Sequence, residues 1–146
     1  MDRIDPKLPF GGTTIARSRM LLARCLAEMG KAKADRRELK KASALLDQSI
    51  FRRKILPAEW HEAEAGVLLR EGNAAAAIKA LQAAVQLRRP GEATLMCGHV
   101  YSAMRLATAL DRLSELLIAA GDESAAGKAR QEASEYRVRF KLPATG

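Results

Sequence analysis

Apolar residues recur every three or four positions along most of the chain, which is the period of a helix with one buried face. The pattern is clearest between residues 60 and 87, where two apolar stripes are separated by Gly72-Asn73. The glycine can adopt the left-handed conformation that ends a helix, and the asparagine side chain can cap the next helix. This stretch therefore predicts two antiparallel helices joined by a tight turn. A single hairpin of this kind cannot bury its apolar face alone, so it needs similar neighbours.

Similar helical segments precede and follow this hairpin. Gly30-Lys31 and Gly121-Asp122 resemble its turn, whereas Pro6 and Pro9 exclude a helix from the N-terminus. The sequence predicts an all-α domain of about six helices in three antiparallel helical hairpins, because β-branched and aromatic residues are sparse. The expected segments are an extended arm at 1–12, a domain at 13–141 and a tail at 142–146. Within the domain we expect helices at 13–29, with Thr13 or Thr14 as the cap, and at 34–54, a central hairpin from Pro57 to the residue before Pro90, and helices at 92–120 and 122–140.

The first helix is expected to bury the large side chains of its apolar stripe. These are Ile15, Met20, Leu21, Leu22, Cys25, Leu26 and Met29. Both cysteines of the chain, Cys25 and Cys97, lie within helical patterns, so we expect them to be reduced and buried.

Residues 58–91 resemble a tetratricopeptide repeat. The matching positions are Ala65, Leu68, Gly72-Asn73, Ala77-Ile78, Leu81, Ala84, Leu87 and, one residue late, Pro90. The Gly turns are 42 and 49 residues apart instead of 34, and Arg130 occupies a position that is usually large and apolar. The chain is therefore similar to the longer, irregular tetratricopeptide-like repeats of bacterial regulators and adaptors. The resemblance implies a short superhelix of stacked hairpins.

In the family, the first helix of each hairpin lines a concave face that binds peptides. The resemblance places these positions on Arg17, Met20, Arg24 and Glu28, on Glu59, Glu62, Leu69 and Arg70, and on Thr108, Asp111, Glu115 and Ile118. Such a groove would be basic at one end and acidic at the other, and would orient an extended or helical peptide by its charge. The alternative is that these residues form solvated faces. None of these positions is an asparagine, so we do not expect the family's clamp for a terminal Glu-Glu-Val-Asp.

The positive charge is concentrated at the start of the chain. Residues 1–54 hold 14 Lys/Arg and 6 Asp/Glu, which accounts for the whole formal charge of +8. This region predicts contact with acidic protein or, as an alternative function, with nucleic-acid phosphates. The candidate anion patch consists of Arg36, Arg37, Lys40, Lys41, Arg52 and Arg53. Aromatic residues for base stacking make up only 4% of the chain, so a solvated basic face competes with this interpretation.

No catalytic or metal-binding signature is complete. His61-Glu62 begins like the zinc-protease motif HExxH, but the second histidine is replaced by Ala65. Cys97 and His99 have no second ligand pair nearby, and no phosphate-binding glycine loop is present. We therefore expect no enzymatic activity, no metal and no cofactor.

The sequence also bears on location. It has no apolar run long enough for a membrane span, and residues 1–12 lack the apolar core of a secretory signal. We expect a cytoplasmic protein without a membrane partner. The terminal Leu142-Pro143-Ala144-Thr145-Gly146 matches the LPxTG sorting motif without the apolar segment that follows a natural signal. An engineered ligation tag and chance both remain open.

Together these features predict a non-enzymatic module that binds a protein or peptide, with an acidic partner favoured by the charge. It would act as an adaptor, a chaperone or the sensor domain of a regulator. A third interpretation is a homo-oligomer that associates through the alanine-rich segment 74–84.

Overall fold

The computed structural model describes residues 11–46, 55–89 and 100–143. These residues form six α-helices, in agreement with the predicted all-α class. The helices are α1 (Gly11–Glu28), α2 (Ala32–Ser43), α3 (Ile55–Arg70), α4 (Ala74–Arg88), α6 (Val100–Ala119) and α7 (Glu123–Phe140).

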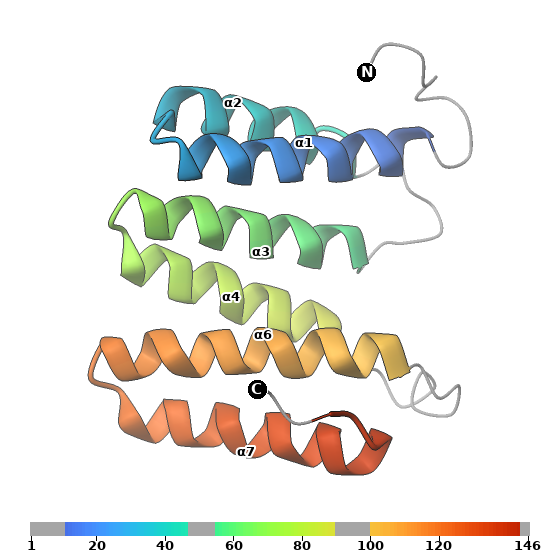
Figure 1. The fold of residues 1–146 in the computed structure, drawn as a ribbon, viewed down its shortest axis with the longest axis vertical. Helices are drawn as coiled ribbons and strands as arrows, with labels where there is room; N and C mark the ends of the chain where they lie inside the picture. The colour runs from blue at the N-terminus through green and yellow to red at the C-terminus, as the bar shows by residue number, and fades with distance from the viewer. Residues whose placement is uncertain (1–10, 47–54, 90–99, 144–146) are drawn as a thin grey trace.

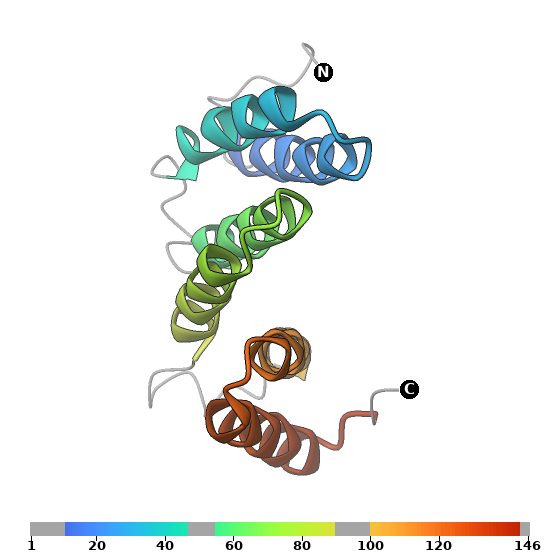
Figure 2. The same ribbon diagram turned by 90° about the vertical axis from the view of Figure 1, so that its left-hand side faces the viewer.

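The helices form three antiparallel hairpins that stack in chain order. Helix α1 pairs with α2, α3 with α4, and α6 with α7 (Figure 1). Between hairpins, α3 packs on α1 and α2, whereas α6 packs on α4. The tight turns of all three hairpins lie on the same side of the stack, on the left of Figure 1. The stack is curved, so the hairpins do not follow one straight line (Figure 2).

The tight turns have the predicted chemistry. Gly30, Gly72 and Gly121 have φ angles of 69°, 78° and 82°, in the left-handed region that favours glycine. Asn73 accepts a hydrogen bond from the Ala76 amide at 3.1 Å, and Asp122 accepts one from Ala125 at 3.0 Å. These two side chains therefore cap α4 and α7.

Several predicted boundaries were wrong. Helix α1 begins at Gly11, so Thr13 and Thr14 lie inside its first turn instead of preceding it. Helix α2 ends at Ser43 and not at residue 54. The Ser43 hydroxyl donates to the Lys40 carbonyl oxygen at 2.8 Å, a local bond that competes with continuation of the helix. The predicted start of the fifth helix, at residues 92–99, lies outside the described residues.

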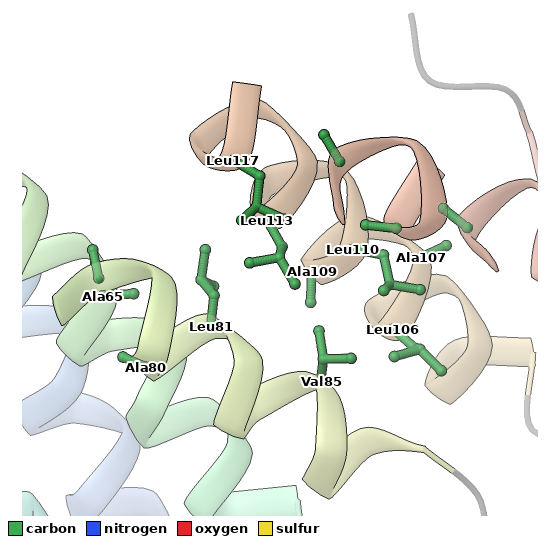
Figure 3. Close-up of a cluster of buried hydrophobic side chains, with 14 of the residues drawn as sticks. Ala65, Ala80, Leu81, Val85, Leu106, Ala107, Ala109, Leu110, Leu113 and Leu117 are labelled. Atoms are coloured by element: carbon green, nitrogen blue, oxygen red, sulfur yellow. The ribbon is translucent and has the colours of Figure 1, made fainter. Parts of the chain in front are cut away.

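The core consists of two clusters in which alanine is as frequent as the large aliphatic residues. One cluster joins α1, α2 and α3, and the other joins α3, α4, α6 and α7. In the second cluster, Leu81 of α4 points toward Leu113 of α6, and Val85 of α4 points toward Ala109 (Figure 3). Alanine at the remaining contact points lets neighbouring helix backbones approach closely.

The buried stripe of α1 differs from the predicted one. Its buried positions are Ala16, Met20, Ala23 and Ala27, spaced by four, three and four residues. Leu21, Leu22, Cys25 and Met29 are exposed, which corrects the expectation that they are buried. Three of these four buried positions are alanines, which let α2 and α3 pack closely on α1, and Met20 is the large side chain among them.

The contact between the second and third hairpins can be tested at Leu81, which is fully buried. We expect Leu81→Ala to lower the free energy of unfolding by about 2–5 kcal/mol, because it removes apolar contacts and leaves a cavity. Urea denaturation followed by circular dichroism would measure this change. Val138→Ala is the control, since Val138 is 78% exposed, and it should change stability by less than about 0.5 kcal/mol. Equal effects of the two substitutions would contradict the packing described here.

A buried carboxylate joins α1 to α2. Glu38 accepts hydrogen bonds from Lys41 at 2.6 Å and from Arg19 at 2.7 Å. The Lys41 ammonium and, after it, the Arg19 guanidinium lower the pKa of Glu38 below its ordinary value of 4.5, although burial opposes them. A lowered pKa means that the folded state favours the charged form. The stability from these bonds is therefore present above pH 4.5 and is lost as pH falls through the lower, folded-state pKa.

This linkage predicts a difference between the native chain and Glu38→Gln. The native chain should lose stability on acidification below pH 4.5, and Glu38→Gln should be less stable at neutral pH but lose less on acidification. Urea unfolding measured over a pH series checks this. Parallel stability profiles for the two proteins would show that Glu38 does not carry the effect.

Candidate functional site

A cavity of about 590 Å³, here called the central cavity, lies among the first helices of the three hairpins. It forms where α6 packs on α4, so that α1, α3 and α6 surround a space instead of filling it. The lining residues are Arg17, Met20, Leu21 and Arg24 of α1, Glu59, Glu62 and Ala63 of α3, Leu81 of α4, and Tyr101, Arg105, Thr108, Ala109 and Arg112 of α6.

The central cavity has an apolar floor and an apolar rim. Met20, Ala63 and Leu81 are buried at its base. Leu21 of α1 and Tyr101 of α6 are 61% and 64% exposed at its edge. Large exposed apolar side chains beside a cavity are typical of a surface that binds another molecule.

Glu59 and Arg17 form an ion pair across the cavity wall. The Arg17 guanidinium donates Nε to Glu59 at 2.6 Å and Nη2 at 2.7 Å, which joins α1 to α3. This bidentate bond raises the pKa of Arg17 above its ordinary value, although partial burial opposes it. The carboxylate of Glu59 is therefore already neutralised by the chain itself.

Glu62 connects three helices. Its carboxylate accepts a hydrogen bond from Arg105 of α6 at 2.6 Å and another from Nε of Arg88 of α4. The Arg88 side chain is only 6% exposed, and its Nη2 has no hydrogen-bond partner among the described residues. The Glu62 carboxylate thus links α3 to α6 beside the central cavity and compensates the buried charge of Arg88.

A second cavity of about 270 Å³, here called the turn-side cavity, adjoins the first. Its lining residues are Arg24, Glu28, Gly66, Leu69, Arg70 and Arg112. Arg70 donates to Glu28 at 2.9 Å, so this pair also joins α1 to α3. Arg24 and Arg112 line both cavities, and neither has an acidic partner within the part of the chain that the structure describes.

Most of the predicted groove residues are brought together. The central cavity contains Arg17, Met20, Arg24, Glu59, Glu62 and Thr108, and the turn-side cavity contains Arg24, Glu28, Leu69 and Arg70. All of these residues except Thr108 belong to α1 and α3. In these two helices, the groove positions predicted from their distance to Gly30 and Gly72 face the cavities.

The predicted groove residues of the third hairpin are placed differently. Asp111 accepts a hydrogen bond from Arg137 of α7 at 3.1 Å, and neither cavity is lined by Glu115 or Ile118. Helix α6 instead presents the positions Tyr101, Arg105, Thr108 and Arg112 to the central cavity. Their spacing of four, three and four residues is the sequence signal that could have identified this face.

The charge of the groove also differs from the expected basic and acidic ends. Four arginines and two glutamates line the central cavity, and both glutamates are bonded to arginines. The acidic end is therefore neutralised internally, and the unpaired charge that remains in the two cavities is positive.

The candidate anion patch on α2 is only partly available. Arg36 donates Nε at 2.8 Å to Glu71, in the turn that follows α3, and Lys41 is bonded to Glu38. Arg37 and Lys40 are exposed and have no acidic partner among the described residues. Arg52 and Arg53 lie outside the described residues.

Other groups that could carry chemistry are dispersed. His61 lies 3.3 Å from Glu64 and packs edge-on against Trp60, whereas Cys97 and His99 fall outside the described ranges. No group of three or more His, Cys, Asp or Glu side chains within residues 11–46, 55–89 and 100–143 could hold a metal ion. Within the same ranges, every helix is too short or too polar to cross a membrane.

Comparison of the chain with protein-family models, curated proteins and solved structures finds no match.

The role of Glu62 can be tested by removing its charge. We expect Glu62→Gln to lower the free energy of unfolding by about 3 kcal/mol or more, because it leaves Arg88 buried without a counter-charge. Glu28→Gln is the matched control. Glu28 is 58% exposed, so loss of its bond to Arg70 should cost less than about 1 kcal/mol. Chemical denaturation of both variants provides the measurement, and equal losses would contradict the proposed role of the buried carboxylate.

Proposed function

We propose that the chain is a non-enzymatic, tetratricopeptide-like module that binds a peptide or partner helix in the central cavity. The observation that supports this proposal most directly is the cavity itself, which is bordered by the first helix of each hairpin. Its volume of about 590 Å³ suits a few side chains of a bound segment. An adaptor, a chaperone or the sensor domain of a regulator would use such a groove.

The composition of the groove favours an amphipathic partner. Leu21 and Tyr101 offer exposed apolar surface, and the largely buried Met20 lines the same cavity. The unpaired arginines favour acidic residues on the partner. An amphipathic helix with apolar and acidic side chains would satisfy both features, in the manner of helix-in-groove recognition.

Two other interpretations receive less support. Nucleic-acid binding through residues 17–54 is weakened because Arg17, Arg19, Arg36 and Lys41 are already bonded to carboxylates. Self-association through residues 74–84 is weakened because the chain's own helices bury Ala77, Ala80 and Ala84. Duplex DNA should therefore bind weakly or not at all at low salt. Tight binding at low salt that disappears at high salt would favour the nucleic-acid alternative.

Selection of peptides from a random library tests the proposed function. The probe is a display library of peptides of about 15 residues, long enough for about four helical turns, presented to the full chain. We expect recovered peptides to slow amide hydrogen exchange in α1, α3 and α6 more than in α2 and α7. Recovery of no binding peptide, or protection confined to α2 and α7, would contradict the proposed groove.

Leu21→Ser provides a second readout in the same experiment. Leu21 is exposed at the rim, so this change should leave the fold intact and weaken the recovered peptides about tenfold, by removing apolar contact area. Val138→Ser, at an exposed position of α7, is the matched control and should leave affinity unchanged.

A further inference from the structure

We infer that Arg24 and Arg112 together bind one carboxylate of the partner at the junction of the two cavities, next to an apolar side chain of the partner at Leu21. This inference rests on the proposed function and specifies its ligand. The partner would carry an aspartate or glutamate close to a large apolar residue.

Arg24 and Arg112 differ from the other arginines of the two cavities in their ion pairing. Arg17, Arg70 and Arg105 each donate to a glutamate of a neighbouring helix. Arg24 and Arg112 line the same space and have no such partner among the described residues. Two like charges that border one space repel each other, so an anion between them would relieve the repulsion and gain charge-assisted hydrogen bonds.

The junction of the two cavities has room for a ligand group. Arg24 belongs to α1 and Arg112 to α6, and both line the central and the turn-side cavities. Gly66 of α3 lines the turn-side cavity with them and has no side chain to fill the space. A Cβ added there would lie 4.0 Å from Cγ of Arg24, which is an ordinary contact distance. The stem of Arg24 therefore passes over the glycine, and open space remains for a ligand group.

Apolar surface lies next to the junction. Leu21 precedes Arg24 by three residues, which is close to one helical turn, so both side chains lie on the same side of α1. Both line the central cavity. A partner that covers Leu21 with an apolar residue can therefore place a nearby carboxylate at Arg24. A carboxylate suits this site better than a neutral group because guanidinium ions bind it bidentately.

The test uses the peptide that binds the full chain most tightly in the random-library selection, together with a synthetic version in which each Glu or Asp is replaced by its amide. We expect the native chain to bind the amide version about tenfold or more weakly, because a charge-assisted bond is lost. Arg24→Gln and Arg112→Gln should each weaken the acidic peptide to a similar degree. Each variant should bind the acidic and amide peptides with more similar affinities than the native chain does. The arginine and the peptide carboxylate act at one site, so removing both weakens binding little more than removing one.

Two matched controls isolate the junction. Arg130→Gln removes an exposed arginine on α7 that lines neither cavity and has no acidic partner among the described residues, and it should leave the affinity unchanged. Gly66→Leu fills the junction without changing any charge and should abolish binding of the acidic peptide, whereas Gly66→Ala should fold at least as stably as the native chain. Circular dichroism of each variant establishes that it is folded, and the arginine variants alone decide the inference if Gly66→Leu does not fold.

The outcomes separate the two proposals. Peptides that bind the groove but contain no acidic residue, or that bind Arg24→Gln and Arg112→Gln as tightly as the native chain, would overturn the carboxylate site and leave the groove in place. Losses equal to that of Arg130→Gln would likewise overturn it, as a general effect of net charge. Failure to recover any peptide would remove both proposals.

Discussion

The charge pattern of the groove depends on ion pairs between its helices. Glu28, Glu59 and Glu62 each accept hydrogen bonds from arginines of a neighbouring helix. These bonds join α1 to α3 and α3 to α6, so they fix the helices that surround the cavities. They also neutralise the negative charge of the three carboxylates. The arginines without a partner therefore determine which ligands the groove attracts.

The cavity itself follows from how the hairpins pack. In the first two hairpins, α3 contacts both α1 and α2, and alanine at the contact positions allows close approach. Between the second and third hairpins, α6 packs on α4 through Leu81 and Val85. Helix α6 therefore does not cover α3 as α1 and α2 do. The ion pair between Glu62 and Arg105 connects α3 to α6 on the side of the central cavity. Apolar packing on one side and a polar bridge on the other thus produce a space large enough for a ligand.

Local features of the sequence predicted most of the fold, and long-range features of the site could not be predicted. Gly72 and Asn73 specify a turn by their own backbone and side-chain preferences, so the hairpins were identifiable. The buried face of α1 was misplaced because leucine was favoured over alanine, and close helix packing reverses that preference at Leu21. The ion pairs between α1 and α3 and between α3 and α6 join residues 42 or 43 positions apart, and no local pattern encodes such partners. Of the α6 face only Thr108 was predicted, for a related reason, because the rotation of α6 depends on its packing against α4.

Nitrogen-15 NMR of the arginine side chains of the full chain tests the central claim, that some groove arginines are paired internally and two are not. The Nε–H groups of Arg17 and Arg88 donate to glutamates, so their protons should exchange slowly with water. The Nε–H groups of Arg24 and Arg112 should exchange rapidly in the free protein. Protection of Arg24 or Arg112 equal to that of Arg17 would show that the chain already supplies their partner, and would contradict the account.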